Sequence, residues 1–230
     1  MAPTSSRSGP TTPVEAAPDR PRRGRQAEAA RNDEAILDAA RAVLLRDPEA
    51  SMATVAQAAG VGVGGLYRRY SGRDELLQQV CGDGLRRFAA LAEAAIADSD
   101  GGGDAWEALE RFLSRVVEAD VHALTVRLAG TFRSTTALRD LAARSGMLVD
   151  EVVRRALASG RLRADVSAAD LPMVLEQLTA VRVEDPERTA ALRRRYLRLH
   201  LDALRTPEPS RLEEPAPTGS ELRERWDRSH

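Results

Sequence analysis

The sequence predicts an all-α protein, and three observations lead to this fold class. Between residues 27 and 205, apolar side chains recur at helical spacing and are interrupted only by short breaks. The alternation of apolar and polar residues that marks a half-buried strand is missing. Aromatic residues, which favour strands, make up only 3% of the chain. The 230 residues suffice for one or two helical domains with a sizeable core.

The first predicted helix covers residues 27–46. Its apolar residues, among them Ile36 and Leu44, fall on one face of a 3.6-residue period. Asn32, which two acidic residues follow, is typical of a helix start, and the alanine-rich segment before it extends the helix to residue 27. Pro48 ends the helix because proline disfavours a helical conformation in the residue before it.

Two short helices follow, at residues 52–59 and 63–69. Ser51 can cap the amides of the first, and Gly60 suits the corner because glycine tolerates positive φ at a helix end. Small and apolar residues such as Leu66 lie where two helices must approach closely. We interpret this segment as a helix-turn-helix, whose second helix enters the major groove of DNA.

The rest of the core is predicted to be helical as well. A long fourth helix, residues 73–97, begins after Gly72, and residues 99–104 form a predicted flexible joint. Gly160 and Pro186 mark later boundaries. The further predicted helices cover residues 105–119, 121–133, 136–159, 167–183 and 186–205.

The chain is expected to hold two helical domains between disordered ends. The ends, residues 1–26 and 206–230, are rich in proline and polar residues and cannot bury enough surface to offset their ordering entropy. The domain boundary falls inside the fourth helix, which gives domains at 27–80 and 81–205. Two details stay open, namely a short helix around Trp226 and whether the arginine-rich arm before residue 26 solubilises the chain or touches DNA.

Composition makes several classes of protein unexpected. With one cysteine, Cys81, and three distant histidines, no disulfide framework, metal site or cofactor is expected, and Cys81 is predicted to be an inert buried thiol. No nucleophile–base pair or phosphate-binding loop is visible, so an enzyme is not expected. No apolar run could span a bilayer and no signal peptide is visible, so a cytoplasmic protein without a membrane partner is predicted.

Phenol and guanidinium groups gather at the end of the second short helix. Tyr67, Arg68, Arg69 and Arg73 carry donors that suit phosphate oxygens. A run of arginines usually forms a solvated face, but the turn and the tyrosines around these favour contact with DNA. Tyr70, in contrast, is predicted to be a core residue.

Several short motifs follow one another along residues 31–80. They are Ile36-Leu37-Asp38-Ala39-Ala40, Val55-Ala56, Ala59-Gly60-Val61, Leu66-Tyr67, Tyr70 and Arg73-Asp74-Glu75-Leu76-Leu77. In combination they resemble the TetR family of bacterial transcriptional regulators. The resemblance implies an N-terminal three-helix DNA-binding domain joined to a helical ligand-binding and dimerisation domain. It further implies a homodimer, most simply a repressor, that binds a palindromic double-stranded operator and is released by a small-molecule effector.

The sequence departs from the family pattern at the tip of the recognition helix. Glycine stands at Gly62, where the family usually has a capping Ser or Thr, and at Gly65, where it often has Thr. Base reading would then rely on Val63 meeting thymine methyl groups, on close backbone approach, or on the preceding helix. The predicted DNA-binding residues are Ser51, Ala53, Thr54, Val63, Gly64, Gly65, Tyr67, Arg68, Arg69 and Arg73. The glycines also favour an alternative, a helical ligand-binding or adaptor protein with weak or lost DNA binding.

The second domain allows only broader predictions. Residues 106–132 and the ending RRRYLRLHLDALR are similar to an SbtR-like C-terminal domain. The last two long helices are expected to form a four-helix bundle across a two-fold axis, as in the family. The predicted dimer residues are Met173, Gln177, Leu178, Val181, Leu192, Tyr196 and Leu199. A pocket with an apolar wall and a few polar anchors, or else an ordinary core, would contain Trp106, Phe112, His122, Thr125, Arg127, Phe132 and Met147.

Overall fold

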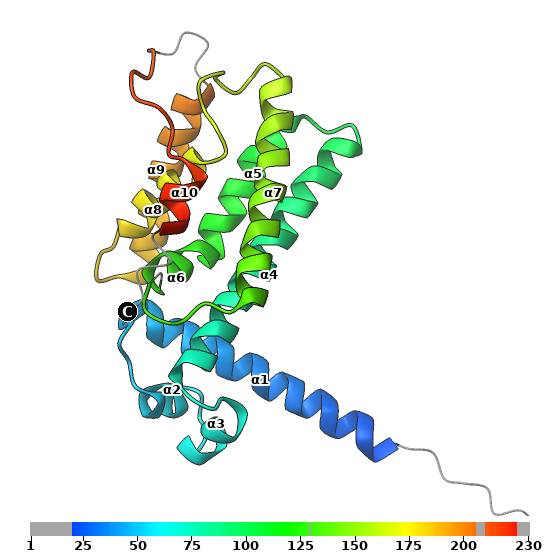
Figure 1. Cartoon of the computed structure of the whole chain (residues 1–230), viewed down its shortest axis with the longest axis vertical. Coiled ribbons are helices and arrows are strands. Elements are labelled where there is room, and N and C mark those ends of the chain that lie inside the picture. The colour runs from blue at the N-terminus through cyan, green and yellow to red at the C-terminus, as the bar shows by residue number, and fades with distance from the viewer. Residues whose placement is uncertain (1–19, 129, 206–209, 225–230) are drawn as a thin grey trace, which may run out of the picture. The chain divides into compact units, whose positions relative to one another are not determined.

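The computed structural model describes residues 20–128, 130–205 and 210–224, with side chains from residue 32 onward except those of residues 125, 126 and 223. All regular elements in these ranges are helices, which confirms the all-α prediction (Figure 1). The contacts divide the chain into two units, residues 1–35 and 36–230. Helix α1 (Arg20–Arg46) begins at Arg20 rather than at residue 27. No helix in the described ranges is both long and apolar enough to cross a membrane.

The breaks between helices lie close to the predicted ones. Helix α6 ends earlier than predicted, and the C-terminal helix α10 lies before Trp226. Trp226 and residues 1–19 of the predicted arm lie outside the described residues. The helices after α1 are α2 (Met52–Ala58), α3 (Val63–Arg69), α4 (Arg73–Asp100), α5 (Ala105–Glu118), α6 (Val121–Leu128), α7 (Thr136–Ala158), α8 (Asp170–Ala180), α9 (Pro186–Arg205) and α10 (Gly219–Glu224).

Two clusters of buried side chains hold residues 36–230 together. The first joins the inner faces of α1 to α3 and the start of α4, and it also takes in Leu124, Leu128, Phe132 and Leu138 from α6 and the start of α7. The second lies among α4, α5, α7, α8 and α9, where α4, α5 and α7 pack alongside one another (Figure 1). Helix α4 therefore contributes to both clusters, and so does α6, with Leu124 and Leu128 in the first cluster and Val121 in the second.

The connection from α4 to α5 is a tight turn built on glycine. The Gly103 amide donates to the Asp98 carbonyl at 3.0 Å. A Cβ at Gly103 would lie 2.7 Å from the Asp98 carbonyl oxygen, so only glycine fits there. Asp104 then caps α5 by accepting a hydrogen bond from the Glu107 amide at 3.0 Å. The segment predicted to be a flexible joint thus has a defined hydrogen-bonded conformation.

Two buried side chains of the core, Cys81 and Arg193, carry groups that can ionise. Burial raises the pKa of the Cys81 thiol to about 12, so this thiol is inert at neutral pH, as predicted. Arg193 is buried on α9, where its guanidinium donates to the Thr179 and Val181 carbonyls, both at 3.2 Å, and to the Asp120 carboxylate at 2.8 Å. It thereby satisfies the C-terminal carbonyls of α8 and joins α9 to the turn before α6.

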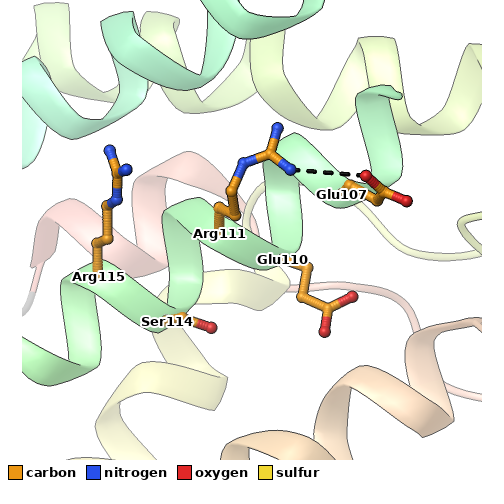
Figure 2. Close-up of a pocket in the computed structure, with 5 residues that line it drawn as sticks. All are labelled: Glu107, Glu110, Arg111, Ser114 and Arg115. Carbon is orange, nitrogen blue, oxygen red and sulfur yellow. Dashed lines mark ion pairs between the residues drawn. The ribbon is translucent and has the colours of Figure 1, made fainter. Parts of the chain in front are cut away.

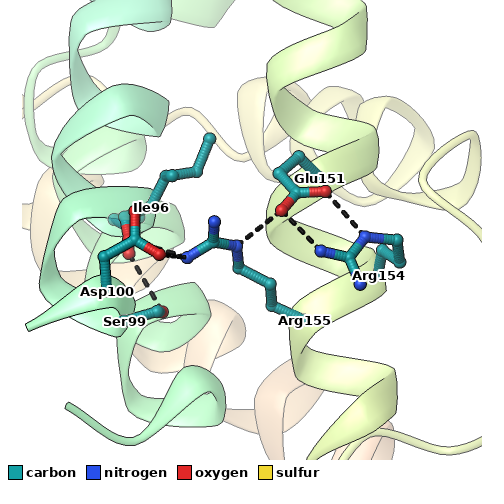
Figure 3. Close-up of polar contacts among 7 residues, drawn as sticks. Ile96, Ser99, Asp100, Glu151, Arg154 and Arg155 are labelled. Carbon is teal, nitrogen blue, oxygen red and sulfur yellow. Dashed lines mark hydrogen bonds and ion pairs between the residues drawn. The ribbon is translucent and has the colours of Figure 1, made fainter. Parts of the chain in front are cut away.

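A second arginine network joins the ends of α4 and α7 (Figure 3). Arg155 donates to the Ile96 carbonyl at 3.0 Å, to the Asp100 carboxylate at 2.6 Å and to the Glu151 carboxylate at 2.6 Å. Hydrogen bonds from Arg154 and then Arg155 lower the pKa of Glu151 from 4.5 to about 2.

This lowered pKa predicts a pH-dependent contribution to stability. Because the folded-state pKa of Glu151 lies below its unfolded value, the carboxylate stabilises the protein above about pH 4.5 and loses this effect as pH falls towards 2. We expect Glu151→Gln to be less stable than the wild type at pH 6 and to approach it at acidic pH. Urea denaturation of both proteins across this range measures the difference. A difference that stays constant down to pH 2 would contradict the assignment.

Candidate DNA interface

The chain turns sharply between α2 and α3. Ser51 caps α2 by accepting a hydrogen bond from the Thr54 amide at 3.1 Å. At the other end of α2, Gly60 adopts a left-handed φ of 68°, and the Val61 amide donates to the Ala56 carbonyl at 3.0 Å. This is the bond of a Schellman motif, which ends a helix and turns the chain away from its axis. The geometry is that of the predicted helix-turn-helix.

Helix α3 buries one face and leaves the other to solvent. Leu66 and Tyr70 are buried in the first cluster, which confirms Tyr70 as a core residue. Val63 is 41% exposed, Tyr67 is 51% exposed, and Arg68 is exposed beside them. We call these three residues the outward face of α3. Within the described residues, the side chains of Tyr67 and Arg68 have no hydrogen-bond or ion-pair partner, so their donors are available to another molecule.

Comparison with known proteins identifies this segment. Residues 36–80 match the family model described as bacterial regulatory proteins of the tetR family. Residues 36–80 therefore form a helix-turn-helix domain of the TetR type. A comparison with curated protein sequences found no match.

Solved structures of TetR-family regulators share the fold. The match to LfrR from Mycobacterium smegmatis, solved in complex with proflavine, is 23% identical, covers 80% of this chain and 99% of LfrR, and has a TM-score of 0.60. The match to a regulator from Mycobacterium vanbaalenii is 25% identical, covers 79% and 99%, and has a TM-score of 0.55. The match to SCO0520 from Streptomyces coelicolor is 24% identical, covers 76% and 99%, and has a TM-score of 0.56.

The glycines at the tip of α3 are not required by the fold. Gly62 is the N-cap residue and provides no side-chain hydrogen bond to α3. A Cβ at Gly62 would meet nothing within 4 Å. At Gly64 and Gly65 an added Cβ would approach only the end of the flexible Arg68 side chain, at 3.9 and 3.6 Å. The absence of side chains here thus leaves bare backbone beside the outward face of α3.

Alanine at either helical glycine is therefore expected to stabilise the protein. Gly64→Ala and Gly65→Ala should each raise the free energy of unfolding by about 0.5–1 kcal/mol, because alanine loses less backbone entropy in a helix. Urea denaturation measures the effect. Gly60→Ala serves as the control and should destabilise, because Gly60 has positive φ. Destabilisation by Gly65→Ala would mean that α3 does not tolerate a side chain there.

The other predicted DNA-binding residues differ in their surroundings. The Ser51 and Thr54 hydroxyls lie 2.9 Å apart at the start of α2, and Ala53 is exposed between them. Arg69 is also exposed.

Arg73, which is predicted to be a phosphate ligand, makes contacts within the chain. Its guanidinium donates to the Pro48 carbonyl, and one of its nitrogens lies 4.0 Å from the Glu49 carboxylate. These contacts tie the start of α4 to the loop before α2. Because one nitrogen of its guanidinium is engaged within the chain, Arg73 can also brace the domain.

The residues predicted to form a ligand pocket lie in different parts of the described structure. Trp106 and Phe112 are each 1% exposed and belong to the second cluster. Phe132 is buried in the first cluster, beside the helices of the helix-turn-helix. Met147 is 65% exposed on α7.

The remaining predicted pocket residues lie on α6. His122 and Arg127 are half-buried, and the His122 ring centroid lies 6.3 Å from that of Phe88. The Thr125 side chain lies outside the described residues.

A hollow of about 520 Å³ lies instead on α5, and sequence reasoning missed it. Its lining recurs at positions i, i+3, i+4, i+7 and i+8 of the helix. That spacing is visible in the sequence, but every amphipathic helix carries such a polar stripe on its solvent face. The lining residues are Glu107, Glu110, Arg111, Ser114 and Arg115.

The residues predicted for the dimer interface differ in their exposure to solvent. Tyr196 and Leu199 are large apolar residues exposed on α9, and Gln177 is exposed on α8. Leu178, in contrast, is 2% exposed and packs in the second cluster, so its side chain is not available to a partner subunit. The half-buried members of the predicted set are Met173, Val181 and Leu192.

Proposed function

We propose that this TetR-family regulator binds a palindromic operator in double-stranded DNA as a homodimer, represses transcription there, and is released by a small molecule. The outward face of α3 carries the proposal. An exposed phenol, an exposed guanidinium and an exposed isopropyl group lie on the second helix of a helix-turn-helix and are left without a partner in the described chain. A second helix of this kind enters the major groove, while the first crosses the backbone.

The side chains of this face suggest a division of labour. Tyr67 and Arg68 offer donors to phosphate oxygens, which are the same at every sequence. Val63, at the tip of α3, offers methyl groups that can meet a thymine methyl in the major groove. Ser51, Ala53 and Thr54 at the start of α2 would lie along the backbone, and Arg69 would add a further phosphate contact. The arginine-rich start of the chain, whose side chains lie outside the described residues, is proposed to reach the same duplex.

A band-shift assay with duplex DNA from the chain's own upstream region tests this function. The wild type should shift the duplex at concentrations that leave a scrambled duplex free. The double variant Tyr67→Ala, Arg68→Ala should lose the shift while its folding is unchanged, since both side chains are exposed. A wild type that is folded and dimeric but shifts no duplex would favour the adaptor alternative, to which the glycines at the tip of α3 point.

The homodimer is proposed to form through α8 and α9. The inner face of α9 packs into the core through Leu197, Leu201 and Leu204, whereas the side chains of Tyr196 and Leu199 are exposed to solvent. Large apolar side chains that recur at helical spacing on an exposed face are typical of an interaction surface.

Leu199→Arg is therefore expected to give monomers, because a guanidinium would have to be buried without a partner in the dimer. Light scattering at micromolar concentration should show the wild type at twice the mass of the variant. Leu199 is 55% exposed, so the variant should fold normally. Ala143→Arg, on the exposed side of α7, is the control and should remain dimeric. A monomeric wild type would contradict the proposal.

Packing of α6 offers a route from a bound small molecule to DNA. Leu124, Leu128 and Phe132 share a buried cluster with the start of α4 and with the helices of the helix-turn-helix. The Gln78 amide of α4 also donates to the Arg133 carbonyl at 2.8 Å. A small molecule that shifts α6 would thus shift α4 and the spacing of the two recognition helices. LfrR, solved in complex with proflavine, supports the proposal that a protein of this fold accepts a small molecule.

A further inference from the structure

The hollow on α5 differs from an ordinary apolar ligand cavity in its chemistry. Its volume of about 520 Å³ falls in the range of small-molecule sites. All five lining side chains are polar or charged, with two carboxylates, two guanidinium groups and one hydroxyl. Their charged and polar groups can recognise a ligand by charge and hydrogen bonds.

The charges of this hollow are only partly satisfied within the chain. Arg111 lies 3.6 Å from the Glu107 carboxylate and 3.5 Å from the Asp98 carboxylate, both longer than a strong hydrogen bond. Glu110 is paired with Arg198 of α9. The side chains of Ser114 and Arg115 make no hydrogen bond or ion pair within the described part of the chain. The basic end of the stripe therefore has unused donors.

The side chains divide between two sides of α5 (Figure 2). Arg111 and Arg115 extend their guanidinium groups to the same side, whereas Glu110 and Ser114 point to the other. The two arginines are four residues apart, a rise of about 6 Å, so one carboxylate can accept hydrogen bonds from both. The Glu110 carboxylate and the Ser114 hydroxyl can accept hydrogen bonds from a protonated amine.

We infer that this hollow binds a small amphoteric molecule that carries one carboxylate and one protonated amine, of the size of an amino acid or short peptide. The carboxylate lies between Arg111 and Arg115, and the amine lies beside Glu110 and Ser114. A purely anionic ligand is disfavoured because Glu107 and Glu110 line the same stripe. The inference rests on the proposed function, since it assigns this molecule as the effector, but the binding step itself needs no DNA.

Triglycine is the probe, since it carries both charges. Titration into the full-length ¹⁵N-labelled protein, followed by NMR, should give saturable shifts centred on the amides of α5. N-acetyl-triglycine lacks the ammonium group, and triglycine amide lacks the carboxylate. Each should therefore bind at least about tenfold more weakly than triglycine. Arg115→Gln should raise the dissociation constant for triglycine by about tenfold or more. Arg188 is exposed on α9 and makes no ion pair with the residues that the structure describes, so Arg188→Gln is the matched control and should leave the dissociation constant unchanged.

Three results would overturn the inference: no saturable shift with triglycine, equal binding of a capped probe, or an unchanged dissociation constant in Arg115→Gln. A band-shift assay on the same samples separates this from the proposed function. A protein that shifts operator DNA but does not bind triglycine keeps the function and loses the site. A protein that binds triglycine on α5 but shifts no DNA keeps the site and loses the function.

Discussion

Replacing Phe112 with alanine is expected to lower the free energy of unfolding by about 3–5 kcal/mol. Phe112 is 1% exposed and packs edge-to-face against Phe88, with ring centroids 5.3 Å apart and an interplanar angle of 68°. Truncation would remove this aromatic pair and leave a cavity among α4, α5 and α7. Chemical denaturation followed by circular dichroism measures the effect.

Met147→Ala is the matched control, because the same sequence reasoning placed Met147 and Phe112 in one pocket. Met147 is 65% exposed, so its truncation should change stability by no more than about 0.5 kcal/mol. If Phe112→Ala left the stability unchanged, Phe112 would line a space that solvent or a ligand fills. That outcome would restore the pocket interpretation of this part of the core.

Truncating Arg68 and replacing Val63 should affect different properties of DNA binding. Arg68→Ala is expected to weaken binding to specific and scrambled duplexes alike, and to reduce the salt slope by about 1 for each phosphate that the variant no longer neutralises, counted over both subunits. Val63→Ser is expected to change the base preference at one position of each half-site by about 1–3 kcal/mol, with little change in salt slope. Salt titrations of binding to both duplexes distinguish the two effects.

Arg73→Ala provides the comparison for Arg68. Its guanidinium is held by the Pro48 carbonyl, so its removal should lower the stability of the domain more than it lowers the salt slope. An Arg68→Ala variant that changes sequence preference but keeps the full salt slope would reverse the roles assigned along α3.

The helices could be predicted because the sequence interrupts them clearly. Pro48, Gly60, Gly72 and Pro186 all lie at or beside a helix boundary, since each disfavours continuation or favours a start. The helix-turn-helix was legible for the same reason, because the glycine at its corner and the buried residues around it are local features. The start of α1 at Arg20 was missed because the Pro-Arg-Arg-Gly segment has no apolar periodicity.

Tertiary placement was the part that the sequence could not provide. Leu178 and Leu199 look equivalent in the apolar pattern of the last helices, but one is buried in the second cluster and the other is exposed. Phe132 follows α6 in sequence and yet packs with the DNA-binding helices. Arg193 would be expected at the surface because arginine is usually exposed. Only the fold brings Asp120 and the end of α8 to its guanidinium. Such interactions depend on how helices distant in sequence meet.

Selection of duplexes from a random-sequence pool by the full chain tests the central claim most directly. The account predicts enrichment of a two-fold symmetric sequence with half-sites one helical turn apart, about 34–36 Å, and affinity that falls with rising salt. The variant Tyr67→Ala, Arg68→Ala should enrich no sequence under the same conditions. A folded, dimeric wild type that enriches no sequence, or an equally effective double variant, would contradict DNA recognition through the outward face of α3.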